Sequence, residues 1–209
     1  MFEEVQLLTH SSIKIEGSRI IYFDPYEIIE ESHDADIVFI THDHFDHYSP
    51  EDIGKVAKDD TWLVMPESMR GKSNEDIPGI ACCRFINPNG ILEVKGLIIK
   101  AVPAYNKFKL FHTKGKKNVG YLVPMDEVVY YVAGDTDMIP EIQKIKCDVA
   151  LVPVGGKYTM DYKDAARLVN MIAPKLAIPT HYGKIAGTPE DGKKFAELVD
   201  KRIEVRVIL

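Results

Sequence analysis

The chain has 209 residues, of which 45% are hydrophobic and 28% charged, and its formal net charge is -6 at pH 7. This composition is typical of a globular protein, and we expect a single domain over residues 1–209. The acidic balance argues against a nucleic-acid-binding protein, which normally carries a basic face. No apolar run is long enough to span a bilayer, the first residues lack the basic start of a signal peptide, and three cysteines make no disulfide framework. We therefore expect a cytoplasmic protein with neither a membrane nor a nucleic-acid partner, and its sequence leaves a homo-oligomer open.

The first half of the chain is rich in predicted strands. A partly alternating stretch at residues 7–15 and a return strand at 20–23 flank the turn Glu16-Gly17-Ser18. After a polar loop, the apolar run 37–40 is typical of a fully buried strand, and it ends directly on a cluster of histidines. Ser49-Pro50 indicates a helix start, because serine caps helix N-termini and proline fits the first helical position. Further strands are predicted at residues 61–65, 80–86, 91–94 and 97–103.

The second half changes to an alternation of strands and helices. It begins with a long polar loop at residues 105–118 that is rich in lysine. Strands are then predicted at residues 119–124, 128–133, 149–154, 176–180 and 204–209, and helices near 140–146, over about 162–173 and from 188 onward. Many strands first and an alternation later predict an α+β protein, in which stacked sheets carry helices on their outer sides.

Four potential metal ligands lie within six residues, directly after the buried strand at 37–40: His42, His44, Asp46 and His47. Side chains at alternate positions point the same way while a strand stays extended, so His42 and His44 could bind one ion. The turn that follows could bring the other two toward a second ion. Imidazole and carboxylate ligands suit zinc, with iron or manganese as alternatives. Ordinary core histidines are the other explanation, but three of them so close together would be costly to bury unpaired.

Two further predicted strands also end on a potential ligand. Asp135 follows the strand at 128–133, and His181 follows the strand at 176–180. Taken alone, Asp135 could be a turn residue or a helix cap, and His181 could be an ordinary loop residue. Their shared position at the ends of buried strands favours a common site, because open sheets assemble binding sites at such ends.

The segments THDHFDH, GDTD and PTHYG together resemble the metallo-β-lactamase superfamily, whose motif is H-x-H-x-D-H. The segments THSSIKIEG, VPAYN and PVGGKYTMD resemble small zinc-dependent hydrolases of the ascorbate-6-phosphate lactonase type. The resemblance extends over nearly the whole chain and implies a four-layer αββα sandwich with two metal ions along one edge. It assigns His42 and His44 to the first ion, Asp46, His47 and His181 to the second, and Asp135 to the bridge between them.

One position departs from the family pattern. The third histidine of the first ion often follows Pro-Ala in related small proteins, but this chain reads Val102-Pro103-Ala104-Tyr105-Asn106. His112 is the only histidine between the main motif and Asp135, and a first ion held by two histidines and a bridge would be bound weakly. We therefore predict His112 as the missing ligand, with Asn106 or water as the alternative.

Two bound ions imply hydrolytic chemistry. Cations that share an oxygen lower the pKa of a bound water toward neutrality and polarise the substrate. Asp46 is the predicted catalytic residue, since it could orient this water and pass on a proton. On the resemblance alone, His10 and Asp24 are expected beside the site, where they would fix the rings of the ligand histidines. Each of the two could also be a plain strand or turn residue.

Lysines crowd the loop at 105–118, and Lys157 follows a pair of glycines. In an acidic protein these lysines could attract a phosphorylated or carboxylated substrate, with Lys114, Lys157 and Tyr158 as candidate binding residues. A solvated, lysine-rich loop explains the same residues equally well.

These observations favour a metal-dependent hydrolase that uses two divalent ions to cleave a lactone or a phosphoester of a small anionic substrate. A di-iron redox enzyme shares the implied fold, but that branch typically has glutamate in place of His44 and a fused flavin domain. A metal-stabilised scaffold without activity is the third alternative. The large ligand set argues against it, because a structural zinc site is usually closed by four ligands.

Overall fold

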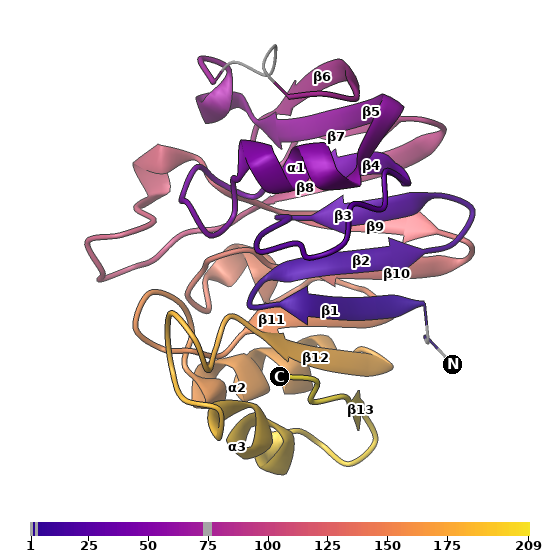
Figure 1. Cartoon of the computed structure of the whole chain (residues 1–209). Helices are drawn as coiled ribbons and strands as arrows, with labels where there is room; N and C mark the ends of the chain where they lie inside the picture. Colours follow the sequence, from indigo (N-terminus) through magenta and orange to yellow (C-terminus); the bar gives the residue numbers. More distant parts are fainter. Residues whose placement is uncertain (1, 3, 73–76) are drawn as a thin grey trace.

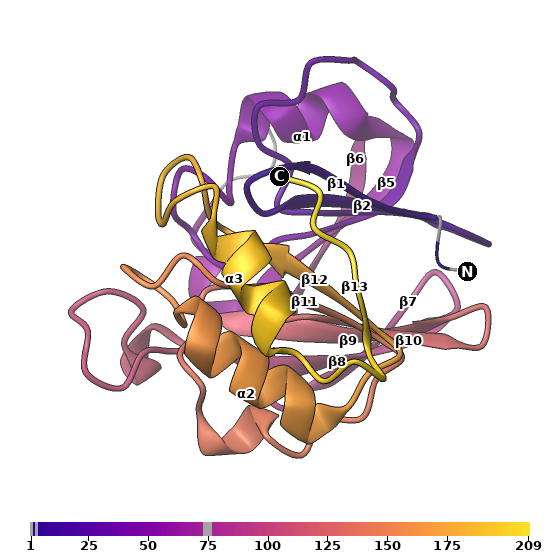
Figure 2. The same ribbon diagram turned by 90° about the horizontal axis from the view of Figure 1, so that it is seen from below.

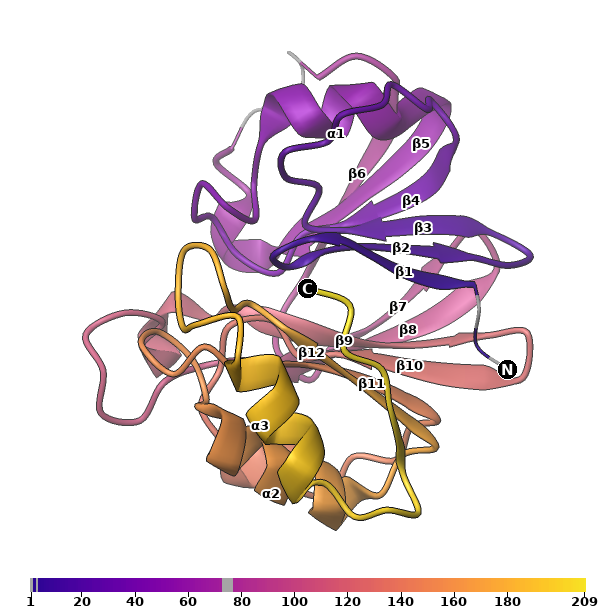
Figure 3. The same cartoon turned by 60° about the horizontal axis from the view of Figure 1, so that its bottom comes forward.

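Two β-sheets lie face to face and carry helices on their outer sides (Figures 1 and 3). The computed structural model describes residues 2, 4–72 and 77–209. Within these residues, the first sheet has six strands in the order β1-β2-β3-β4-β5-β6. The second has seven, in the order β13-β12-β11-β10-β9-β8-β7. The first half of the chain therefore builds one sheet, and the second half builds the other.

The strands of the first sheet are β1 (Val5–Thr9), β2 (Ser12–Glu16), β3 (Ile20–Phe23), β4 (Ala35–Phe39), β5 (Ala57–Pro66) and β6 (Ile80–Ile86). Those of the second are β7 (Ile91–Val94), β8 (Leu97–Pro103), β9 (Val119–Met125), β10 (Val128–Val132), β11 (Val149–Pro153), β12 (Leu176–Thr180) and β13 (Glu204–Val205). The helices are α1 (Pro50–Val56), α2 (Tyr162–Ile172) and α3 (Asp191–Leu198), with short 3-10 turns at η1 (Glu67–Met69), η2 (Lys114–Lys116) and η3 (Pro140–Ile142). No helix in the described part of the chain has the length and apolar character that crossing a bilayer requires.

Three apolar layers hold the sheets and helices together. Residues such as Phe39 and Tyr121 pack between the sheets, and Ile53 joins a second cluster between α1 and the first sheet. Leu168 and Phe195 belong to a third cluster, between the second sheet and its helices α2 and α3. Figure 2 shows these two helices on one side of the molecule and α1 on the opposite side. Burying each such side chain is worth about 1.5–3 kcal/mol. The layers confirm the predicted αββα sandwich.

The direction of the strands brings several strand ends to one edge. β4 pairs in parallel with β3 and β5, while β10, β11 and β12 run parallel to one another in the second sheet. β11 and β12 are buried at every position, as the continuous apolar runs of parallel strands predict. The loops that leave the second sheet after β8, β11 and β12 project from one side, at the left of Figure 3. The carboxyl ends of β4, β10 and β12 carry the predicted ligands.

Three predicted elements differ from the structure. The stretch at 7–15 is two strands, β1 and β2, because the backbone turns at His10, whose φ of 43° lies in the left-handed region. The helix near 140–146 is a single 3-10 turn, in which Gln143 N donates to the carbonyl of Pro140. The strand at 204–209 is reduced to Glu204–Val205, because only these two residues pair with β12. The predicted start of α1 is confirmed, with Ser49 as the N-cap.

Candidate metal centre

Six of the seven histidines of the chain gather at one edge of the two sheets, together with two buried aspartates. Their side chains form three groups in which the potential ligand atoms lie within 4.8 Å of one another. The groups are His42, His44 and His112; His10, Asp46 and His181; and His42, His47 and Asp135. The remaining histidine, His33, lies apart, with its Nδ1 2.9 Å from the carbonyl oxygen of Ala57.

The segment after β4 reaches the site through a tight turn. The hydroxyl of Tyr121 donates to the carbonyl of Ile40 (2.7 Å), which fixes the end of the strand. The amides of His47 and Tyr48 then both donate to the carbonyl of His44, at 3.0 and 2.8 Å. This turn folds Asp46 and His47 back over the strand end, so that potential ligands up to five residues apart can share one site.

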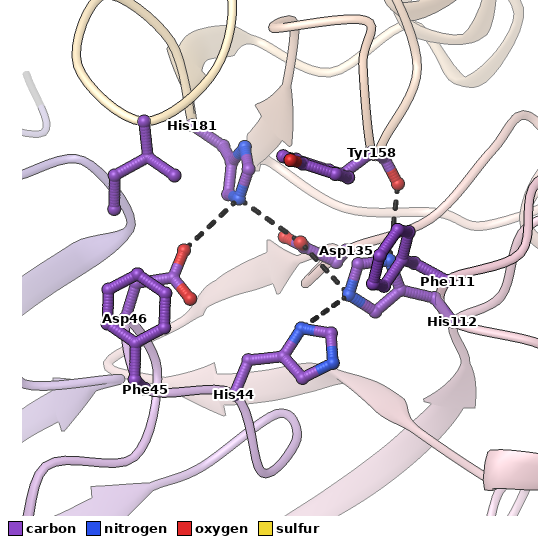
Figure 4. A pocket seen from close by; sticks show the side chains of 9 residues that line it. His44, Phe45, Asp46, Phe111, His112, Asp135, Tyr158 and His181 are labelled. Atoms are coloured by element: carbon purple, nitrogen blue, oxygen red, sulfur yellow. Dashed lines mark hydrogen bonds and ion pairs between the residues drawn. The ribbon is translucent and has the colours of Figure 1, made fainter.

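The second sheet supplies Asp135 and His181 from the ends of β10 and β12. Asp135 follows Gly134, whose φ is 63°, and a Cβ at that glycine would lie 3.1 Å from the Cβ of Thr41. Glycine therefore allows this turn to approach the end of β4. The amide of His181 donates to the carbonyl of His10 (2.9 Å), which ties β12 to the turn between β1 and β2. The site thus takes ligands from both sheets, as Figure 4 shows.

Asp135 lies at the border of the ligand groups. Its Oδ2 is 3.1 Å from Nε2 of His181 and 3.4 Å from Nε2 of His112, while its Oδ1 is 3.4 Å from Nε2 of His47. Asp46 faces the second group, with its Oδ2 3.4 to 3.6 Å from Nε2 of His10, His47 and His181. One carboxylate therefore touches both sides of the site, and the other touches one side.

Asp24 fixes two of the predicted ligand histidines. It accepts hydrogen bonds from Thr41 N (2.8 Å), the Thr41 hydroxyl (2.7 Å) and Nδ1 of His47 (2.7 Å). Because the hydroxyl of Thr41 donates to Asp24, its oxygen is free to accept from Nδ1 of His42, 3.0 Å away. Both rings then present Nε2 to the site, the arrangement by which a carboxylate normally orients a metal-binding histidine.

Unpartnered buried atoms show that the residues fit metal ions. Among the described residues, the buried side-chain atoms without a hydrogen-bond partner include Nε2 of His42, Nε2 of His47 and Oδ1 of Asp135. Buried polar atoms are normally hydrogen-bonded, so a group of buried nitrogen and oxygen atoms that face one another without hydrogen-bond partners needs an explanation. Divalent cations bound between these atoms would satisfy them, and the mixed imidazole and carboxylate set suits zinc, manganese or iron.

His112 and Asn106 lie side by side, with different contacts. His112 Nδ1 lies 3.2 Å from the carbonyl oxygen of Tyr158, to which it can donate, and its Nε2 faces Asp135 and lies 3.0 Å from Nδ1 of His44. The amide of Asn106 donates to the carbonyls of Phe111 (3.0 Å) and Tyr158 (2.6 Å). The structure therefore places His112 among the ligand atoms and uses Asn106 to hold the loop that carries it.

His10 lies among the ligand atoms themselves. It is almost fully buried, its ring centre is 4.0 Å from that of His181, and neither of its nitrogens has a hydrogen-bond partner. His10, Asp24, His112 and His181 all have a positive φ, between 43° and 56°. Such backbone costs free energy in residues other than glycine and concentrates at functional sites. The alternating pattern at 7–15 gave no sign of this turn.

The two aspartates control the protonation of the surrounding histidines in the metal-free protein. Burial alone would lower the pKa of His181, but the carboxylates of Asp135 and Asp46 raise it to about 10. Burial lowers the pKa of His42 well below its ordinary value, and it lowers the pKa of His112 as well. A cation must therefore displace a proton from His181, whereas these other two histidines are already neutral.

The predicted substrate-binding residues lie at different distances from this site. Tyr158 lines the pocket above the ligands, with the ammonium of Lys157 4.9 Å from the centre of its ring. Lys114 is not among the residues that line the pocket; its Nζ is 3.0 Å from Oε1 of Glu141. The pocket has a volume of about 230 Å³, and its remaining lining includes Phe45, Phe111 and Ile185, which sequence reasoning missed.

The chain matches a known protein family over most of its length. The family described as the beta-lactamase superfamily domain matches residues 4–181. The chain belongs to this superfamily. UPF0173 metal-dependent hydrolases from Pyrococcus horikoshii and Thermococcus onnurineus are 30% and 31% identical to it, over 98% of this chain and 96% of each relative. The chain is therefore a member of the UPF0173 family within the superfamily.

A solved structure supports the same conclusion. A protein from Parabacteroides distasonis, to which metal-dependent hydrolase activity has been ascribed, is 31% identical to this chain. The two superpose with a TM-score of 0.83, over 97% of this chain and 91% of the other. The superfamily member described here is thus a metal-dependent hydrolase with the metallo-β-lactamase fold and a His/Asp site of the binuclear type.

Proposed function

We propose that the protein hydrolyses a lactone or a phosphoester of a small anionic substrate with the help of two divalent metal ions. The observation that carries this proposal is the convergence of two ligand groups, bordered by Asp135, on one open pocket. A structural zinc site is closed by its own ligands, whereas this site faces a cavity that a substrate can enter. The open cavity favours an enzyme over a metal-stabilised scaffold.

The ligand atoms divide between two ions. We assign the first ion to His42, His44 and His112, the second to Asp46, His47 and His181, and Asp135 to both. Zinc is the ion that this set suits best, with manganese and iron as alternatives. Bound there, the ions supply a water whose pKa is lowered toward neutrality and polarise the oxygen of the scissile bond.

Asp46 is the residue that we assign to proton transfer. It lines the pocket, and burial alone would raise its pKa. The neighbouring imidazoles of His10 and His181 outweigh burial, hold the pKa of Asp46 well below its usual value and keep the carboxylate ionised. In the reaction, the water oxygen bonds to the carbonyl carbon or to phosphorus, and the bond to the leaving oxygen breaks. The proton of the water passes by way of Asp46 to the leaving oxygen.

Phosphorylated lactones are the first substrates to test. The resemblance to the ascorbate-6-phosphate lactonase type rests on the segments THSSIKIEG and PVGGKYTMD. In the structure the first of these segments carries His10, and the second carries Tyr158 in the pocket lining. Both segments therefore lie where they can influence the choice of substrate.

The experiment measures turnover by protein loaded with zinc, manganese or iron on phosphodiesters, phosphorylated lactones and thioesters. We expect turnover of at least one class in at least one metal form, its loss after chelation and its return when the ion is restored. Turnover of no class in any metal form would favour the scaffold. Oxygen consumption by the iron form would favour the redox enzyme.

A further inference from the structure

Four largely apolar side chains wall the pocket above the metal centre. Phe45, Phe111, Tyr158 and Ile185 come from the loops after β4, β8, β11 and β12. The floor is polar and consists of the predicted ligands His44, Asp46, His112, Asp135 and His181. Figure 4 shows the rings of Phe45 and Phe111 on either side of this floor. A molecule that reaches the ligands must therefore pass between apolar walls.

The walls are not part of the protein core. Phe45 is 67% exposed although it lies inside the metal-binding segment, and Phe111 is 52% exposed. Exposed aromatic rings that gather at one cavity mark a binding surface, because water is a poor environment for them. The rings have defined neighbours: Phe111 lies edge-on to Tyr158 at 5.3 Å, and Phe45 lies edge-on to Tyr26 at 6.0 Å.

Positive side chains are absent from the lining of this pocket, as far as the described residues show. Three lysines of the neighbouring loops pair with acids instead: Lys109 with Asp137, Lys114 with Glu141 and Lys184 with Glu27. Lys109 also donates to the carbonyl of Thr159 (2.6 Å). The ammonium of Lys157 lies 4.9 Å from the ring centre of Tyr158. Within the lining itself, a second negative group on a substrate would therefore meet apolar side chains rather than a cation. Positive charge inside the pocket would come from the metal ions.

We infer that the site takes an ester, lactone or phosphoester in which the group next to the scissile bond is small and apolar. This inference rests on the proposed function and narrows its substrate to one whose negative charge lies at the scissile group, so that phosphoesters rank before phosphorylated lactones. The polar or charged scissile group faces the metal ions, and the hydrocarbon group contacts Phe45, Phe111, Tyr158 and Ile185. A volume of about 230 Å³ admits a short chain or a single ring, since sites for drug-sized ligands start near 300 Å³.

Binding of straight-chain carboxylates tests the inference without turnover. The zinc-loaded full chain is titrated by calorimetry with acetate, butyrate and hexanoate, whose carboxylate faces the ions while the chain contacts the walls. Each buried methylene is expected to tighten binding about fourfold until the pocket is full. Succinate, with a second carboxylate at its far end, is expected to bind more weakly than butyrate. Equal affinities along the series, or tighter binding of succinate, would overturn the inference.

Ile185→Ala is the decisive variant, because Ile185 lines the pocket and has no ligand atom. We expect hexanoate to bind about tenfold more weakly, with acetate affinity and metal content unchanged. Phe108→Ala is the matched control, since Phe108 is 97% exposed on the loop of Phe111 yet does not line the pocket. Equal losses in the two variants, or no loss in Ile185→Ala, would contradict the assignment.

Turnover separates this inference from the proposed function. With the p-nitrophenyl esters of acetate, butyrate and hexanoate, kcat/KM is expected to rise with the length of the acyl chain. The rise is expected to be less steep in the Ile185→Ala variant than in the wild type. No turnover of these esters, or of the phosphodiesters, phosphorylated lactones and thioesters named above, with the chain-length dependence of binding preserved, would refute hydrolysis and keep the apolar pocket. A second copy of the chain is the other candidate occupant. If the wild-type protein is a dimer in solution and the Phe45→Ala variant is a monomer, the apolar side chains form an interface between copies of the chain, and the inference is overturned.

Discussion

The two ligand groups of the metal centre differ in charge. His42, His44 and His112 are all imidazoles, and burial lowers the pKa of the first and the last. The other group contains Asp46, and Asp135 borders it; together these carboxylates outweigh burial and raise the pKa of His181 to about 10. The first group therefore offers neutral ligands without competition from protons, whereas the second offers negative charge and holds a proton that a cation must displace. Two ions in one site need not bind with the same affinity or over the same pH range.

Removing the residue common to both groups is expected to have the largest effect. In Asp135→Asn the side chain keeps its shape but loses the charge that faces His181, His112 and His47. We expect both ions to bind more weakly and kcat/KM to fall on the order of 1,000-fold, measured with the best substrate found. Asp59→Asn, at an exposed position near the start of β5, is the control and should behave as wild type. Loss of one ion only would show that Asp135 is not a bridge.

His112→Ala separates the two groups. This histidine contacts His44 and Asp135, so its loss should weaken the first ion on the order of 100-fold and leave the second in place. Metal analysis after dialysis should then find one ion per chain instead of two. His33→Ala is the matched histidine control, because His33 lies outside the ligand groups. Two ions at unchanged affinity would instead point to Asn106 or water as the ligand.

The pH dependence of metal binding should distinguish the groups without mutation. The pKa of His181 in the metal-free protein is about 10, so this histidine is protonated at neutral pH and loses its proton as the pH rises. Affinity for the second ion should therefore increase with pH, by at least about tenfold per unit below 10, because the carboxylates of Asp135 and Asp24 raise the pKa of His47 as well. The first ion should show little change above pH 7, because the pKa values of His42 and His112 are lowered. Competition with a chromophoric chelator between pH 6.5 and 9 measures both, and parallel curves would contradict the assignment.

The smallest effect is expected at Lys114. Its ammonium is paired with Glu141 and does not line the pocket. Lys114→Ala should therefore leave kcat/KM for a phosphorylated substrate within about twofold, as is usual for an exposed ion pair. A fall of tenfold or more would show that the lysine-rich loop binds the substrate after all.

The strand ends were the part of the site that the sequence could reveal. Apolar runs followed at once by His42, Asp135 and His181 indicate buried strands with ligands at their ends, and the structure brings these residues together. His10 could not be located in this way, because the left-handed turn that divides β1 from β2 leaves the alternation of residues 7–15 nearly intact. Hydrophobic periodicity reflects the side chains of a segment, so it does not reveal a single residue whose backbone has a positive φ.

The residues that form the walls of the pocket could not be predicted from the sequence, for another reason. Phe45, Phe111 and Ile185 lie in loops that are far apart along the chain, and only the packed sheets bring them to one cavity. The acidic partners of the lysines could not be predicted either, since only the folded chain brings Lys114 next to Glu141. Contacts of this kind depend on loop conformation rather than on any local pattern.

The origin of the ligands in both sheets has a consequence for the stability of the fold. An ion bound by His47, Asp135 and His181 joins the end of β4 to the ends of β10 and β12, and so closes two long loops of the polypeptide. The unfolded chain does not hold these ligands together, so each ion binds the native state and stabilises it by mass action, and this effect is lost when the ion is removed. The ions thus act as removable cross-links between the two halves of the sandwich. The concentration of available metal therefore affects the free energy of unfolding as well as the catalytic rate.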